Sequence, residues 1–272
     1  MKFTYLGTAA AEGFPAVFCN CGFCNFARKN GGKNIRTRSQ AIVNSDLLID
    51  LPADTYMHFL NNGICGHKIK YLLVTHSHPD HFYYSELLMR NGAFAHNMEA
   101  EILEVFCGEG VYNKVIENGV PENVRVTKVL PFKPFGIGEY NITALPARHF
   151  EGDGALIYII EQQGKRMLYA HDTGYFFDEL FDYFTGNKIR FDMVSLDCTN
   201  ADIPKSDTGS HMGFDNIGRL LEKLKNDGVV DEKTIVYVNH FSHNGNPEHS
   251  LLCQKAKKLG AYVSYDGCTV NI

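Results

Sequence analysis

The segment Thr75–His81 reads THSHPDH and directly follows the apolar run Tyr71–Val74, YLLV. It places three imidazoles and one carboxylate within six residues. A neutral imidazole is the commonest metal ligand in proteins, and a loop after a rigid strand can hold several at fixed separations. The alternative is a polar loop in which Asp80 caps a helix over residues 82–89. Clustered histidine and carboxylate side chains mark metal or catalytic sites, so we predict a metal site.

The geometry of an extended chain suggests two metal centres in this loop. His76 and His78 are two residues apart and therefore point the same way, whereas Asp80 and His81 leave the loop in another direction.

Composition narrows the class of protein. The chain has 272 residues, enough for one large layered domain over residues 1–272, and 44% hydrophobic residues supply a core. The net charge is -5 and there is no basic block, which argues against a long nucleic acid partner. No apolar run approaches ~18 residues, and the first residues lack the apolar core of a signal peptide. We expect a cytoplasmic protein without membrane contact; the sequence leaves the oligomeric state open, a homodimer included.

Apolar periodicity predicts strands that are interrupted by helices without regular alternation. Mixed sheets flanked by helices are therefore expected. The predicted strands cover residues 3–6, 41–43, 47–49, 71–74, 102–106, 124–129, 140–145, 155–160, 166–169, 192–196 and 234–238. The predicted helices cover residues 52–60, 82–89, 109–117, 213–225 and 247–259.

Four potential ligands each follow a predicted strand: His76, His149, Asp172 and His240. Strand ends present sites well, because the strand fixes the backbone and the loop frees the side chain. Taken alone, His149 could be a polar turn residue and Asp172 could cap a helix that starts near Tyr175. His171 is adjacent to Asp172 and should face the opposite way, so we leave it out of the site.

The ordered set resembles the metallo-β-lactamase superfamily, whose signature is a His-x-His-x-Asp-His loop followed by a His, an Asp and a last His. The resemblance covers nearly the whole chain and implies an α/β fold, a four-layer αββα sandwich of two mixed sheets flanked by helices. It also implies two divalent metals, with His76, His78 and His149 on one, Asp80, His81 and His240 on the other, and Asp172 bridging. Zinc, manganese and iron all suit such mixed imidazole and carboxylate ligation.

A two-metal site can lower the pKa of a bridging water toward neutrality and clamp a phosphoryl or acyl oxygen. The resulting hydroxide would be the nucleophile, oriented by Asp80. Hydrolysis would then need no activated side chain.

A second cluster is formed by Cys19, Cys21 and Cys24, which cannot all pair in disulfides because one thiol is left over. Three thiolates favour a fourth ligand, and His243 lies three residues after His240. We predict a closed Cys3His structural zinc site; the alternative is free thiols and a surface histidine. The remaining cysteines are expected to be small buried hydrophobic residues, namely Cys65, Cys107, Cys198, Cys253 and Cys268.

These cysteines, together with residues 6–9 (LGTA) and 13–15 (GFP), look like the PhnP-like cyclic-phosphodiesterase branch of the superfamily, and the N-terminus is also similar to PqqB. The resemblance implies that His211 is the general acid for the leaving alcohol, a role that suits imidazole near neutral pH. The alternative is a loop residue that caps the next helix. One departure is Asp50-Leu51-Pro52, where many family members have Asp-Gly, so a supporting role for Asp50 stays open.

The leading hypothesis is a metal-dependent phosphodiesterase that hydrolyses a small, cyclic or nucleotide-like phosphate ester. Other hydrolases of the fold are the alternatives, either ribonuclease Z-like or a glyoxalase II-like thioesterase. The chain lacks the inserted basic arm of the first, and the second lacks the cysteine cluster. A PqqB-like cofactor-biosynthesis or metal-binding protein without hydrolytic turnover is the alternative from a different class.

Overall fold

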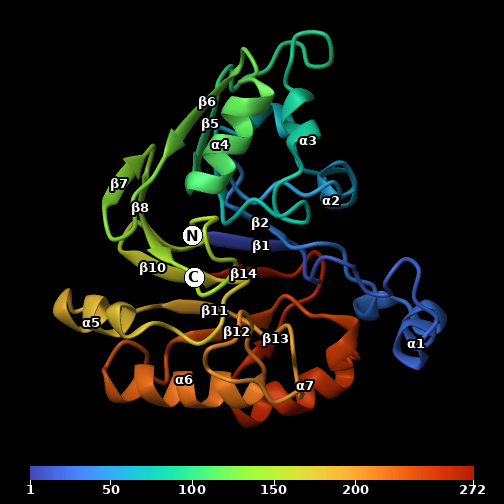
Figure 1. Cartoon of the computed structure of the whole chain (residues 1–272), viewed down its shortest axis with the longest axis vertical. Helices are drawn as coiled ribbons and strands as arrows, with labels where there is room; N and C mark the ends of the chain where they lie inside the picture. The colour runs from blue at the N-terminus through green and yellow to red at the C-terminus, as the bar shows by residue number, and fades with distance from the viewer.

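Two seven-stranded sheets form the centre of the computed structural model, which describes residues 1–272 (Figure 1). The first sheet contains, in spatial order, β14 (Thr269–Asn271), β1 (Lys2–Gly7), β2 (Gln40–Val43), β3 (Leu47–Ile49), β4 (Tyr71–Val74), β5 (Leu103–Cys107) and β6 (Val124–Lys128). The second contains β13 (Tyr262–Val263), β12 (Ile235–Asn239), β11 (Met193–Asp197), β10 (Lys165–Ala170), β9 (Leu156–Gln162), β8 (Tyr140–Pro146) and β7 (Pro134–Ile137).

Helices cover the outer face of each sheet, as Figure 1 shows. One helix, α1, stands apart from both layers at the side of the molecule. The first sheet is covered by α2 (Thr55–Asn62), α3 (Tyr84–Leu88) and α4 (Glu109–Asn118), the second by α5 (Asp178–Gly186), α6 (Phe214–Asn226) and α7 (His249–Lys258), and α1 spans Gly22–Asn30. This is the four-layer αββα fold that the sequence predicts. None of these helices combines the length and the apolarity that crossing a membrane requires.

The alternation of side chains along β9 shows why both sheet faces are buried. Leu156, Tyr158 and Ile160 belong to the cluster between the two sheets. Ile157 and Ile159 point the other way, into the cluster beneath α5, α6 and α7. Because a strand presents successive side chains to opposite faces, a strand in the middle layer must be apolar at every position.

Strand direction brings the ends of four strands to one edge of the second sheet. β10, β11 and β12 are parallel neighbours. β8 runs the same way, since β9 is antiparallel to both β8 and β10. The residues that follow these strands are therefore neighbours in space although they are far apart in the chain.

Most predicted elements are present, including the hairpin of β2 and β3 and the hairpin of β9 and β10. Two helices and three strands were not predicted: α1, α5, β7, β13 and β14. α2 begins at Thr55 and α7 at His249, a few residues after the predicted starts. α1 has a weak sequence signal because its N-cap is Cys21, whose sulfur accepts from the Cys24 N–H.

Candidate metal centre

Three histidines from two loops form the first group. His76 and His78 lie in the loop after β4, and His149 lies three residues after β8. His78 Nδ1 lies 3.0 Å from His76 Nε2 and 3.2 Å from His149 Nε2. Nitrogens that each lie roughly 2.1 Å from one ion are about 3.4 Å apart in tetrahedral geometry, so these three atoms fit a shared cation.

The second group is formed by Asp80, His81, Asp172 and His240, all of which are buried. His81 Nε2 lies 2.9 Å from Asp172 Oδ2, 3.2 Å from His240 Nε2 and 3.4 Å from Asp80 Oδ2. Asp172 Oδ2 also lies 3.3 Å from His76 Nε2 in the first group. The carboxylate of Asp172 is thus positioned between the two groups, as a bridging ligand would be.

Two polar atoms of the centre are buried without a hydrogen bond of acceptable geometry, Asp172 Oδ1 and His149 Nδ1. Burial alone would raise the pKa of Asp172, but His240 and His81 hold it well below its ordinary value. A buried carboxylate in contact with several imidazole nitrogens fits divalent cations, because imidazole and carboxylate are both ligands for such ions. The donor set therefore fits two metal ions.

Asp50 orients His81. Its carboxylate is fully buried and accepts from Thr75 N at 2.8 Å, from Thr75 Oγ1 at 2.9 Å and from His81 Nδ1 at 2.8 Å. A carboxylate only accepts, so His81 carries its proton on Nδ1 and Nε2 is left with a lone pair. The sequence left a supporting role for Asp50 open, and in the structure Asp50 supports His81 through this hydrogen bond.

Asp197 supports the opposite side of the centre and was not predicted. It ends β11 and is fully buried. Its Oδ2 accepts from Asp172 N at 3.0 Å and from Thr199 Oγ1 at 2.9 Å. Thr199 Oγ1 also lies 2.7 Å from His240 Nδ1. Because the hydroxyl donates its proton to Asp197, it accepts the hydrogen bond from His240 Nδ1. The strand-end position that singled out the other residues could have identified Asp197 as well.

Asp153 is a further carboxylate that the sequence analysis missed. It is buried and accepts from Ser77 N at 2.8 Å, between His76 and His78. A Cβ on Gly110 would lie 1.8 Å from Asp153 Oδ1, so α4 packs directly against this contact. No local pattern marks Asp153, because its partner is 76 residues away.

Three residues of the centre have left-handed backbones: Asp50 with φ of 66°, Asp172 with 55° and His240 with 65°. Such conformations cost on the order of 1–3 kcal/mol and concentrate at functional sites. Asp80 caps no helix, since Tyr83 precedes α3, and Asp172 lies well before the Phe177 N-cap of α5. The two capping alternatives are therefore wrong.

His211 lies beside the buried groups and is partly open to solvent, with 26% of its side chain exposed. Its Nδ1 lies 3.0 Å from Asp172 Oδ1 and 3.4 Å from Asp197 Oδ2. Burial would lower the pKa of His211, but the two carboxylates raise it to about 10. The N-cap of α6 is Gly213, so His211 does not cap that helix.

The cysteine cluster is also assembled. Cys19, Cys21, Cys24 and His243 converge, with His243 Nδ1 3.8 Å from Cys21 Sγ and 3.6 Å from Cys24 Sγ. The backbone N–H of Cys24, and then His243, lower the pKa of the Cys21 thiol to about 6. Three thiols and one imidazole fit a closed tetrahedral metal site.

The isolated cysteines and His171 complete the comparison with the sequence. Cys107, Cys198 and Cys268 are buried as expected, but Cys65 and Cys253 are exposed, which corrects the prediction for those two. His171 points away from the centre, as predicted: its Nε2 lies 2.7 Å from Ser195 Oγ and its Nδ1 3.1 Å from Asn239 Nδ2.

Comparison with known proteins supplies a family and several similar structures. The family model described as "Beta-lactamase superfamily domain" matches residues 59–240. No curated protein sequence matches the chain.

Three solved structures of similar fold cover nearly the whole chain. Zn(2+)-bound PqqB from Methylobacterium extorquens has a TM-score of 0.78 at 17% identity and covers 100% of both chains. A diphosphatase from the PhnP family has a TM-score of 0.72 at 20% identity and covers 100% of this chain and 97% of its own. The short form of human tRNase Z has a TM-score of 0.68 at 15% identity and covers 100% and 99%. At these identities the likeness establishes the fold alone.

Proposed function

The chain belongs to the β-lactamase superfamily, and we propose that it is a metal-dependent phosphodiesterase that hydrolyses a small, cyclic or nucleotide-like phosphate ester. The observation that carries the proposal is the position of His211. The ring of His211 lies against Asp172, which sits between the two ligand groups. His211 is partly exposed to solvent, whereas the ligands of the second group are buried. A substrate held at the centre would therefore meet a proton donor on its open side.

The proposed ligands are those named from the sequence: His76, His78 and His149 for one ion, Asp80, His81 and His240 for the other, with Asp172 shared. Two bound divalent ions would supply Lewis acidity toward the phosphoryl oxygens and lower the pKa of the attacking water. The side chain of Asp80 would orient that water molecule.

His211 would protonate the leaving group. Its Nδ1 faces the carboxylates of Asp172 and Asp197, which can hold the imidazolium, so Nε2 is the nitrogen left to donate. As the bond from phosphorus to the leaving oxygen breaks, that oxygen takes the proton from Nε2. The oxygen of water forms the new bond to phosphorus and its proton is released to solvent. The products are a phosphomonoester and an alcohol, which for a cyclic ester are two groups of one ring-opened molecule.

Phosphorus chemistry is further supported by the similar folds. A diphosphatase and a tRNase are among them, and both names denote cleavage at phosphorus. The net charge of -5 favours a small substrate over a long nucleic acid.

A substrate screen tests the proposal. Metal-free protein is charged separately with zinc, manganese or iron and assayed with bis-p-nitrophenyl phosphate, a cyclic ribose phosphate and S-lactoylglutathione, with Asp172→Ala as the inactive control. We expect turnover of the phosphodiesters and not of the thioester. Thioester turnover alone would overturn the phosphodiesterase assignment. The absence of turnover with every metal would favour a non-hydrolytic, PqqB-like role.

A further inference from the structure

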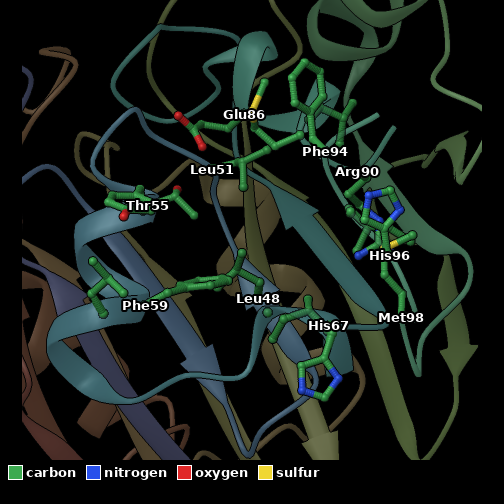
Figure 2. Close-up of a pocket in the computed structure, with 18 residues that line it drawn as sticks. Leu48, Leu51, Thr55, Phe59, His67, Glu86, Arg90, Phe94, His96 and Met98 are labelled. Carbon is green, nitrogen blue, oxygen red and sulfur yellow. The ribbon is translucent and has the colours of Figure 1, made fainter. Parts of the chain in front are cut away.

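A pocket of about 510 Å³ lies on the outer face of the first sheet (Figure 2). Its floor is formed by Leu48, Leu51 and Leu103, which are buried. Its walls come from α2 and from the segment that follows α3, and Figure 2 shows Phe59 on one side and Phe94 on the other. The size and the mainly apolar lining are those of a small-molecule site.

The pocket is accessible from solvent. Tyr56, Leu60 and Phe94 line it and are 66%, 60% and 64% exposed. Large apolar side chains that gather around a hollow and remain exposed indicate a binding surface rather than a packing defect.

One cation in the lining has no anionic partner. Arg90 donates from Nη2 to the carbonyl of Ala100 at 2.6 Å, its Nε has no hydrogen-bond partner, and it forms no ion pair. Burial lowers the pKa of its guanidinium. Glu86 lies one helical turn earlier and also lines the pocket, but it does not pair with Arg90, and Figure 2 shows the two side chains well apart. A half-buried guanidinium beside apolar walls is complementary to an anion.

We propose that this pocket binds a small amphipathic acid, with its apolar or aromatic body on Leu48, Leu51 and Phe59 and its anionic group at Arg90. The pocket shares no residue with the metal groups, so the proposal stands independently of the hydrolytic function.

Two fluorescent probes with one skeleton test the proposal. 8-Anilinonaphthalene-1-sulfonate carries an anion, whereas N-phenyl-1-naphthylamine is its neutral counterpart. Each is titrated into the full-length Asp172→Ala protein, so that the sulfonate cannot bind at an intact metal centre. We expect saturable binding of one sulfonate probe per chain, tighter than that of the neutral probe. Arg90→Gln should lower the affinity for the sulfonate probe by about tenfold or more and leave the affinity for the neutral probe unchanged.

Two further variants locate the binding. Ala95→Phe places a ring in the pocket and should abolish binding of both probes. Arg125→Gln removes an exposed arginine on β6 and should leave the affinity for both probes unchanged. The proposal would be overturned if the two probes bound with equal affinity. It would also be overturned if Arg125→Gln lowered the affinity for the sulfonate probe as much as Arg90→Gln does. Probe binding that falls as protein concentration rises would assign the pocket to a second copy of the chain instead.

Discussion

His81 donates through Nδ1 to the carboxylate of Asp50 at 2.8 Å, and both side chains are fully buried. Asp50 follows β3 and His81 follows β4, so this contact joins the ends of two parallel neighbours. It sets the tautomer of a proposed ligand before any metal arrives.

Asp50→Asn should therefore weaken metal binding at the position of His81 by roughly 10–100-fold. The amide removes the negative acceptor that keeps the proton on Nδ1. Competition with a chromophoric chelator measures the affinity. Asp46→Asn is the matched control, because that carboxylate accepts from Tyr140 far from the centre. Unchanged metal affinity in Asp50→Asn would show that His81 needs no such support.

His211→Ala should lower the turnover of a diester with a poor leaving group by about 10²–10⁴-fold while the metals stay bound. The turnover of a p-nitrophenyl ester should fall less, because p-nitrophenolate leaves without a proton. Metal content by elemental analysis accompanies the kinetics. If the variant keeps full activity toward the poor leaving group, the acid role of His211 is wrong.

Thr199→Val should weaken metal binding at the position of His240, by roughly tenfold or more. The substitution removes the hydroxyl that joins Asp197 to His240 Nδ1. Thr199→Ser keeps the hydroxyl and should restore the affinity. Loss of affinity in both variants would point to packing rather than to hydrogen bonding.

Cys21→Ser should reduce the metal content from about three ions per chain to about two. The serine hydroxyl does not replace a thiolate ligand, whereas the binuclear centre is formed by other residues. Elemental analysis and phosphodiesterase assays on the same sample separate the two sites. Cys253→Ser, at an exposed cysteine outside the cluster, should keep all ions. If Cys21→Ser kept all of its metal ions, the prediction of a structural metal site at the cysteine cluster would be wrong.

Gly174→Ala should lower activity without loss of metal. A Cβ at this position would lie 1.8 Å from the carbonyl oxygen of Gly209, so the loop that carries His211 has to move. The strain should also reduce the free energy of unfolding by about 1–3 kcal/mol. Gly186→Ala is the control, since nothing lies within 4 Å of a Cβ there. Denaturant unfolding and turnover are measured together, and equal activity of the two variants would contradict the prediction.

The sequence by itself predicted mixed sheets flanked by helices and named the residues that meet at the centre, and the resemblance of that ordered set to a known family implied the αββα architecture. Metal ligation demands particular side chains, and loops after strands display them in short, ordered patterns such as Thr75–His81. The apolar runs of β4, β9 and β10 follow from burial on both faces of a sheet. These signals are local, so they can be read along the chain.

Only the tertiary structure decided which single residues support the centre. Asp153 carries no local pattern. Asp197 shares the strand-end position of the ligands, but its contact with the backbone of Asp172, like that of Asp153 with Ser77, joins loops that only folding brings together. The pocket beside Arg90 likewise depends on how α2 and the segment after α3 pack over the first sheet. Such relationships arise when distant segments are brought together by strand order and direction, which local periodicity does not specify.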